Sequence, residues 1–192
     1  MNKFVVAVDV DNVVNDLVEK LIELYNRTYS ANLKFEDFTN YDFFKCLQYD
    51  DAQRLMDLFD ERELWDSLSP RDGAQRGIKH FINRGYDVYF ATNASPITFP
   101  WKVEWLRKYF SMVPEKNIIC INNKGLLQAN VLIDDNIDNL LSSQYYDRVC
   151  IDYAWNRDVH DEVYAINRAH NWDEIVEVVD KLYEYDKEFD LV

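Results

Sequence analysis

Apolar residues occur along this chain in short unbroken runs, and each run ends in polar residues. The first run begins at Phe4 and ends at two aspartates, Asp9 and Asp11, with only Val10 between them. Later runs lie at residues 88–91, 118–121, 131–133 and 149–151. An unbroken, β-branched run is typical of a strand buried on both faces of a parallel sheet, because a half-exposed strand alternates apolar and polar positions. We therefore predict five parallel strands.

Between these runs, apolar residues recur at intervals of three and four, which is the spacing of one helix face. The pattern predicts helices over residues 14–25, 74–82, 101–110, 137–141 and 172–183. The expected buried stripe of the third helix is Trp101, Trp105, Leu106, Tyr109 and Phe110. Asn171, with Glu174 three residues later, forms a variant of the capping box at the start of the last helix. Strands that alternate with helices indicate an α/β fold with a doubly wound parallel sheet.

Residues 31–69 interrupt this alternation. They are rich in aromatic and acidic residues, contain no strand-like run, and show one short helical pattern after Asp50 and Asp51. We predict a small helical insertion between the first and second strands, so that residues 1–30 and 70–192 form the α/β core. Most of its aromatic side chains are expected to fill the insertion's own core, because aromatic residues dominate cores.

Side chains that can perform chemistry follow four of the predicted strands. They are Asp9 and Asp11 after the first strand, Thr92 and Asn93 after the second, Lys124 after the third, and Asp134 and Asp135 after the fourth. Because ligands of open α/β sheets bind beyond the carboxyl ends of the strands, we expect these groups to meet at one edge. Carboxylates that lie a few ångströms apart repel one another. A hard divalent cation such as Mg²⁺, which binds carboxylates and phosphate oxygens, would balance their charge.

Each of these residues also has a simpler explanation. Asp11 or Asn12 could start the next helix, Thr92 could cap a helix, Lys124 could be a solvated loop residue, and Asp134 or Asp135 could cap the helix at 137–141. Caps of these residue types are common. Taken together, however, the simpler explanations require four independent coincidences in the right order. The ordered set therefore favours a phosphotransfer site.

The same ordered set resembles the motifs of the haloacid dehalogenase superfamily, and more closely those of its 5'(3')-deoxyribonucleotidases. The finer resemblance rests on residues 91–96, on the spacing from Lys124 to Asp135, and on residues 152–157. It covers nearly the whole chain, with residues 31–69 only loosely matched. Members commonly have glycine where this chain has Asn12. Asparagine tolerates left-handed backbone angles better than most residues, so we expect the turn to survive.

The resemblance implies a role for each motif residue in phosphate-ester hydrolysis through an aspartyl-phosphate. Asp9 would be the nucleophile and Asp11 the general acid and base. Mg²⁺ would bind Asp9, the main-chain carbonyl of Asp11, and the Asp134–Asp135 pair, with Asp135 as the direct ligand and Asp134 in support. Thr92 would hydrogen-bond a phosphate oxygen beside Asn93, and Lys124 would supply positive charge.

The expected substrate is a deoxyribonucleoside monophosphate. In the resembled family a helical cap closes over the substrate from the position of the insertion. Tyr41 and Phe43 are the candidates for stacking on the base, a contact worth about 1–3 kcal/mol per base in nucleic-acid sites, with Leu17 at the mouth. The alternatives are a phosphatase for another small phosphoester, such as a sugar phosphate, and a non-catalytic nucleotide-binding protein. Intact Asp9 and Asp11 argue against the last of these.

Composition excludes several other classes of protein. A length of 192 residues favours one domain with a small insertion, and a net charge of −14 argues against a nucleic acid polymer as partner. No apolar run reaches the 18 residues of a membrane span, and no Gly-rich phosphate loop or dinucleotide fingerprint is present. The three cysteines have no close spacing, which favours reduced, buried thiols in a cytoplasmic protein. A homodimer is kept as an alternative to a monomer.

Overall fold

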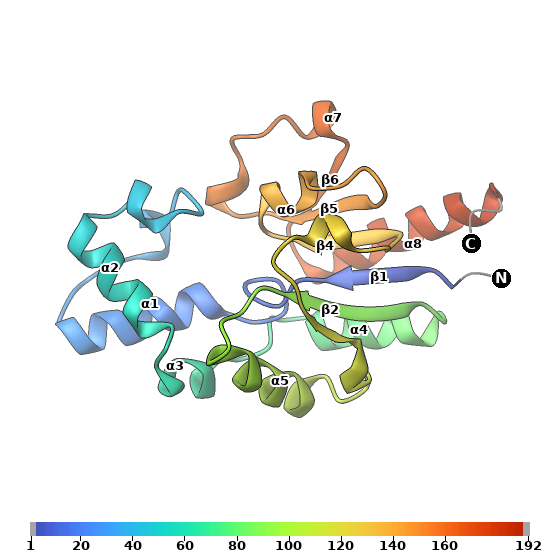
Figure 1. The fold of residues 1–192 in the computed structure, drawn as a ribbon. Helices are drawn as coiled ribbons and strands as arrows, with labels where there is room; N and C mark the ends of the chain where they lie inside the picture. Colours follow the sequence, from blue (N-terminus) through green and yellow to red (C-terminus); the bar gives the residue numbers. More distant parts are fainter. Residues whose placement is uncertain (1–2, 190–192) are drawn as a thin grey trace.

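A six-stranded parallel sheet forms the centre of the molecule (Figure 1). The computed structural model describes residues 3–189. The strands are β1 (Val5–Val8), β2 (Asp87–Thr92), β3 (Ile118–Cys120), β4 (Val131–Asp134), β5 (Asp147–Ile151) and β6 (Ile166–Ala169). Their order is β3-β2-β1-β4-β5-β6, and every neighbouring pair is parallel. The first strand of the chain is therefore central, and β2 and β4 flank it.

All five predicted strands are present, and the doubly wound α/β prediction is confirmed. A sixth strand, β6, was not predicted; it pairs with β5 at the edge of the sheet. Its sequence, Ile-Asn-Arg-Ala, buries only Ile166 and Ala169 fully. An edge strand needs no continuous apolar run, because only one of its sides is paired and its faces are partly open.

Eight α-helices accompany the sheet within residues 3–189. They are α1 (Leu17–Tyr29), α2 (Tyr49–Leu58), α3 (Arg62–Ser67), α4 (Ala74–Asn83), α5 (Thr98–Tyr109), α6 (Ile137–Leu141), α7 (Asp161–Tyr164) and α8 (Trp172–Glu188). The short helices α3 and α7 were not predicted. The predicted cap of α8 is confirmed, because the Asn171 side chain accepts a hydrogen bond of 2.9 Å from the Glu174 backbone N–H.

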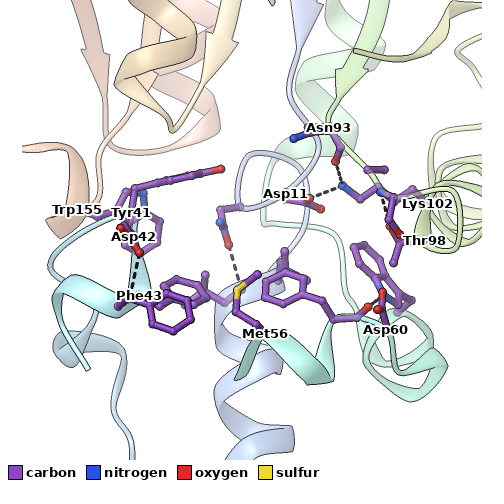
Figure 2. Close-up of a pocket in the computed structure, with 18 residues that line it drawn as sticks. Asp11, Tyr41, Asp42, Phe43, Met56, Asp60, Asn93, Thr98, Lys102 and Trp155 are labelled. Carbon is purple, nitrogen blue, oxygen red and sulfur yellow. Dashed lines mark hydrogen bonds and ion pairs between the residues drawn. The ribbon is translucent and has the colours of Figure 1, made fainter. Parts of the chain in front are cut away.

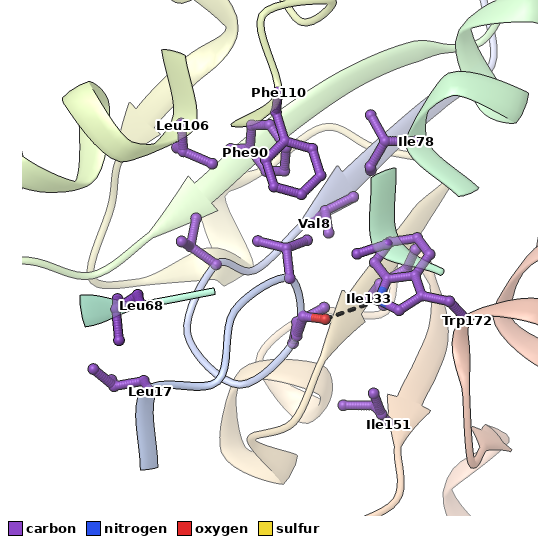
Figure 3. Packing of buried hydrophobic residues seen from close by; sticks show 14 of the residues in the cluster. Val8, Leu17, Leu68, Ile78, Phe90, Leu106, Phe110, Ile133, Ile151 and Trp172 are labelled. Atoms are coloured by element: carbon purple, nitrogen blue, oxygen red, sulfur yellow. Dashed lines mark hydrogen bonds between the residues drawn. The ribbon is translucent and has the colours of Figure 1, made fainter. Parts of the chain in front are cut away.

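The larger part of the core lies between the sheet and the helices α4, α5 and α8. Figure 3 shows Val8 and Phe90 of the sheet packed among Ile78, Phe110 and Trp172 from the surrounding segments. A smaller cluster on the opposite face of the sheet packs under α6. Each fully buried side chain of this size contributes about 1.5–3 kcal/mol, so β1 is held firmly from both faces. The loop that follows it therefore starts from a fixed point.

The segment 31–69 contains helices and no strand among the described residues. Two 3₁₀ turns, η1 (Phe35–Asp37) and η2 (Phe43–Lys45), precede α2 and α3. These elements lie beyond the carboxyl end of β1, together with α1 (Figure 1). Helix α1 packs against α2 and α3, although the predicted division places it in the core. The boundaries at residues 31 and 69 stay a prediction.

The cysteines differ from the sequence-based expectation. All three are free, but only Cys150 is buried, while Cys46 is half-buried and Cys120 is exposed. The exposure of Cys120 follows from its position at the end of β3, an edge strand. Among the residues that the structure describes, no helix combines the length and the apolar character needed to cross a membrane.

Candidate active site

Three carboxylates meet at the carboxyl ends of the two central strands. Asp9 follows β1, while Asp134 and Asp135 end and follow β4, and the parallel pairing of Val8 with Ile133 sets them side by side. One oxygen of each carboxylate lies within 4.8 Å of the others. All three side chains are buried. The sheet therefore brings these three acids together at one edge, as predicted.

Lys124 lies between two of these acids. Its ammonium group donates to Asp9 Oδ1 and, at 2.6 Å, to Asp134 Oδ2, and the side chain is only 1% exposed. The next residue, Gly125, packs against the Ser142 backbone, where a Cβ would lie 2.5 Å from the Ser142 carbonyl oxygen. Lys124 is thus a buried partner of the acids, and the alternative of a solvated loop lysine is wrong.

Burial and crowding change the proton affinity of these groups. Burial, together with the carboxylates of Asp134 and Asp11, raises the pKa of Asp9 from 3.8 to about 7, although Lys124 opposes the change. Burial and the same kind of crowding raise the pKa of Asp135 well above its ordinary value. Although burial opposes it, the charges of Asp134 and Asp9 raise the pKa of Lys124. The acids therefore need more positive charge than the protein supplies in order to ionise fully.

The two neighbouring aspartates differ in how many protein donors they accept. Both oxygens of Asp134 are occupied, by the ammonium of Lys124, the amide of Asn139 and the backbone N–H of Asn136. Asp135 accepts side-chain hydrogen bonds only at Oδ2 among the described residues. Neither aspartate caps α6, because Asn136 does so through the backbone N–H of Asp138. This leaves Asp135 Oδ1 available to an incoming cation.

Asp11 has a partner that the sequence analysis did not identify, Lys102 of α5. The ammonium of Lys102 donates to Asp11 Oδ2, to Thr92 Oγ1 at 2.9 Å and to the Asn93 carbonyl oxygen at 2.7 Å. It also lies 5.3 Å from the centre of the Trp65 ring. Thr92 is completely buried here and caps no helix.

Most of the predicted stripe of α5 is confirmed, because Trp105, Leu106 and Phe110 are buried and Trp101 and Tyr109 are half-buried. The helix also buries two polar residues that were not predicted, Thr98 and Lys102. Lys102 precedes Trp105 and Leu106 by three and four positions, so it shares their helix face. A lysine at that position of an apolar stripe is the signal that could have revealed it.

The turn after Asp11 takes the left-handed backbone expected for Asn12, with φ of 59°. The Asn12 side-chain oxygen accepts from the backbone N–H of Val18 at 3.0 Å, so its helix-starting alternative is partly right. Tyr153 donates to the Asn12 carbonyl oxygen at 2.7 Å, and Trp172 donates to that of Val13 at 2.9 Å. The loop that carries both N-terminal aspartates is therefore tied to distant parts of the core.

A cavity of about 600 Å³ opens above this edge (Figure 2). Figure 2 shows Asp11, Asn93 and Lys102 on one side of it and Tyr41 and Trp155 on the other. The residues 31–69 supply Tyr41, Asp42, Phe43, Phe44, Met56, Phe59, Asp60 and Trp65 to its lining. The cavity thus joins the acidic edge to the aromatic segment.

The three predicted base-side residues all line this cavity, in different states of burial. Leu17 is buried, and Phe43 is half-buried. Phe43 packs edge-on against Phe38, with ring centres 5.1 Å apart. Tyr41 is 54% exposed as a residue, but burial of its hydroxyl, together with the charges of Asp135 and Asp9, raises its pKa. The expected contribution of aromatic residues to the segment's own core therefore holds for Phe38 and, in part, for Phe43.

Comparison with known proteins identifies the family. The model of the family "5' nucleotidase, deoxy (Pyrimidine), cytosolic type C" matches residues 3–183. The 5'(3')-deoxyribonucleotidase of Bacillus subtilis is 30% identical over 175 residues, which are 90% of this chain and 96% of that protein. A 5'(3')-deoxyribonucleotidase of Clostridium acetobutylicum is 25% identical over 73% of this chain and 77% of its own length.

Solved structures show the same fold at much lower identity. A haloacid dehalogenase-like hydrolase from Streptococcus pneumoniae superposes with a TM-score of 0.65 at 10% identity, over 92% of this chain and 98% of the other. The predicted haloacid dehalogenase-like fold is thereby confirmed. The chain belongs to the deoxy (pyrimidine) 5'-nucleotidase family of cytosolic type C and is a phosphomonoester hydrolase.

Proposed function

We propose that this enzyme is a Mg²⁺-dependent 5'(3')-deoxyribonucleotidase that releases phosphate from deoxyribonucleoside monophosphates. The observation that carries the proposal is the buried cluster of Asp9, Asp134 and Asp135, which lies beside an aromatic cavity that Asp11 lines. The relatives' names supply the substrate class. The geometry supports the cation, the phosphoryl chemistry and the base of the substrate.

The balance of charge supports a divalent cation. The edge holds four carboxylates, those of Asp9, Asp11, Asp134 and Asp135, and two ammonium groups, those of Lys102 and Lys124. The sum is two negative charges, and the free donors are oxygens, which suit Mg²⁺. We propose Asp9 and Asp135 as side-chain ligands, with the Asp11 carbonyl as a third. When bound, the cation would neutralise charge on the transferring phosphoryl group.

The residues around the phosphate have separate proposed tasks. Asp9 Oδ2, which no described donor occupies, would attack phosphorus, and the ester oxygen would leave with a proton from Asp11. Asp11 would then take a proton from the water that attacks the aspartyl-phosphate, releasing inorganic phosphate and restoring Asp9. Lys102 would hold Asp11 and Thr92 in place. Lys124 would stabilise the charged phosphoryl oxygens.

The cavity lining supports a nucleoside monophosphate over a more highly charged substrate. Lys102 is the single lysine or arginine in the lining, which also contains the acids Asp42 and Asp60. A second or third phosphate would meet these acids without a counter-charge. The aromatic wall offers flat faces to a base, which a sugar phosphate would not use. A volume of about 600 Å³ falls in the usual range for a small-molecule site.

We further propose that residues 31–69 act as a cap over the bound substrate and exclude water from the reaction. Their aromatic side chains form the wall opposite the acidic edge. The free cysteines support a cytoplasmic location. The choice between a monomer and a homodimer stays open to measurement of the mass in solution.

A substrate panel tests the proposal. Phosphate release should be measured with Mg²⁺ for deoxyribonucleoside and ribonucleoside 5'- and 3'-monophosphates and for sugar phosphates, and repeated with excess chelator. We expect a deoxyribonucleotide to be the best substrate and the chelator to abolish turnover. Better turnover of sugar phosphates would support the general phosphatase instead. Nucleotide binding without phosphate release would support the non-catalytic alternative.

A further inference from the structure

Two side chains from distant parts of the sequence hold one oxygen of Asp135. Asn12 Nδ2 donates to Asp135 Oδ2 at 3.3 Å, and Trp155 Nε1 donates to the same oxygen at 3.2 Å. The backbone of Asp135 is held as well, because Asn156 Nδ2 donates to its carbonyl oxygen at 2.9 Å. The carboxylate is 2% exposed, so these contacts form away from solvent.

The orientation of the Asn12 amide follows from its other contact. Its oxygen accepts from the Val18 backbone N–H at 3.0 Å, which only the oxygen end of an amide can do. The NH₂ end must therefore face Asp135. The left-handed backbone at Asn12 places the side chain between the two partners. A glycine at this position would keep the turn but would lose both hydrogen bonds.

The orientation of Trp155 is also determined by its surroundings. An indole N–H can only donate, so it suits a carboxylate oxygen and no cation. The ring stacks on Tyr153 with centres 4.3 Å apart and planes 13° apart, and the Tyr153 hydroxyl in turn holds the carbonyl of Asn12. Phe35 of the 31–69 segment lies 5.6 Å from the Trp155 ring. The four residues Asn12, Asp135, Tyr153 and Trp155 thus form a closed ring of contacts.

We propose that Asn12 and Trp155 are positioning residues that fix Asp135 Oδ2 so that Oδ1 is the atom presented to the cation. This inference rests on the divalent cation of the proposed function. Asp134 shows the contrast, because protein donors occupy both of its oxygens. Because one oxygen is occupied and the other is free, the Asp135 carboxylate is held in the orientation that the cation needs. Less conformational entropy is then lost when the cation binds.

The test measures cation binding without substrate. Trp155→Phe keeps the ring stack and removes only the N–H, and Asn12→Gly keeps the left-handed turn and removes the amide. The dissociation constant for Mn²⁺ is measured by titration calorimetry on the metal-free protein, with the thermal midpoint at each metal concentration as a second readout. Loss of a hydrogen-bond partner behind a metal ligand typically costs about 10–100-fold in affinity. At 3.2–3.3 Å these contacts are long, so we expect about 10-fold for each variant.

The matched control is Trp101→Phe, on a half-buried tryptophan of α5 that makes no contact with Asp135. It should bind Mn²⁺ like the unmodified protein. The thermal midpoint of metal-free Trp155→Phe should stay close to that of the unmodified protein, because the ring stack remains; a general loosening of the fold would lower it. Should Asn12→Gly fail to fold, Trp155→Phe alone decides.

The outcomes separate the inference from the proposed function. If the unmodified protein binds Mn²⁺ and both folded variants bind it equally well, Asn12 and Trp155 do not position the ligand, and the proposed function stands. If the unmodified protein binds neither Mn²⁺ nor Mg²⁺, the cation site of the proposed function fails and the inference fails with it. A rise of about 10-fold in the dissociation constant for Mn²⁺ in the variants, absent in the control, supports both the inference and the cation site.

Discussion

The acidic edge of the sheet and the aromatic wall of the cavity beside it are built by different means. The strand-edge cluster (Asp9, Asp11, Lys102, Lys124, Asp134 and Asp135) is held by ion pairs and hydrogen bonds between buried groups, with each acid in contact with a donor from another segment. The aromatic wall, from residues 31–69, is held by aromatic packing and leaves Tyr41 and Phe44 exposed. A fixed edge suits the phosphate, which is common to all substrates. An adaptable wall suits the part that differs among them.

Asp9, the proposed nucleophile, gives the largest expected effect on the acidic edge. Asp9→Asn should reduce phosphate release by about 10⁴-fold or more, since removal of one member of a catalytic unit has effects of this size. The fold should persist, because the change is nearly isosteric and relieves repulsion with Asp134. The measurement is phosphate release alongside a thermal melt. Asp72→Asn, on a fully exposed side chain, should leave both unchanged. A near-normal rate for Asp9→Asn would reject the nucleophile assignment.

The two buried lysines come next. Lys124→Ala and Lys102→Ala should each lower kcat by about 10²-fold, by analogy with the loss of one preorganised electrostatic donor. The Lys102 change acts through Asp11 and Thr92, its hydrogen-bond partners. Steady-state kinetics on one deoxynucleotide measures both. Lys187→Ala, on an exposed residue of α8, is the control. Small effects equal to the control would mean that the buried ammonium groups serve the fold alone.

The aromatic wall should show a smaller and more selective effect. Tyr41→Ala should lower kcat/KM for dUMP or dTMP by about 10-fold, the value of one stacking contact. A small artificial phosphoester, which has no base to stack, should be hydrolysed as before. Phe43→Ala should lower kcat/KM for dUMP and also the thermal midpoint, because Phe43 packs against Phe38 as well. A parallel loss for both substrates in Tyr41→Ala would assign Tyr41 to structure.

The smallest effect concerns stability against pH in the absence of metal. Between its ordinary pKa of 3.8 and about 7, Asp9 keeps its proton in the folded protein but loses it in the unfolded chain. The unfolded state then binds fewer protons, so stability should fall as pH rises through this window. In thermal melts, the midpoint of Asp9→Asn should fall less steeply with pH than that of the unmodified protein. For a protein of this size, a loss of 1 kcal/mol lowers the midpoint by about 2–4 °C. Mg²⁺ should stabilise more at pH 8 than at pH 5; equal stabilisation would argue against binding to ionised Asp9.

The contrast between the edge and the wall also explains what the sequence could reveal. The acids at the ends of β1 and β4 were predictable, because unbroken apolar runs mark buried strands and parallel strands share one edge. The role of Lys102 was not predictable, because it depends on how α5 is rotated about its own axis. Helical periodicity indicates which face is buried but does not fix this rotation to the nearest residue. Edge strand β6 carried too few apolar residues to be seen. Trp155 and Asn12 act through contacts between segments, which local patterns do not encode.

The position of β1 in the sheet has a consequence for how the enzyme is made. β1 is synthesised first, but its partners β2 and β4 emerge much later, and Asn12 contacts Asp135 across 123 residues of chain. Contacts of such separation form slowly, because a long loop must close before they are rewarded. During translation the valine-rich strand β1 therefore stays unpaired until β2 and β4 have been synthesised. An exposed, unpaired apolar strand favours aggregation or chaperone binding. The proposed cation site can form only after β4 has left the ribosome, so we expect metal binding to report on the completion of folding rather than to guide its early steps.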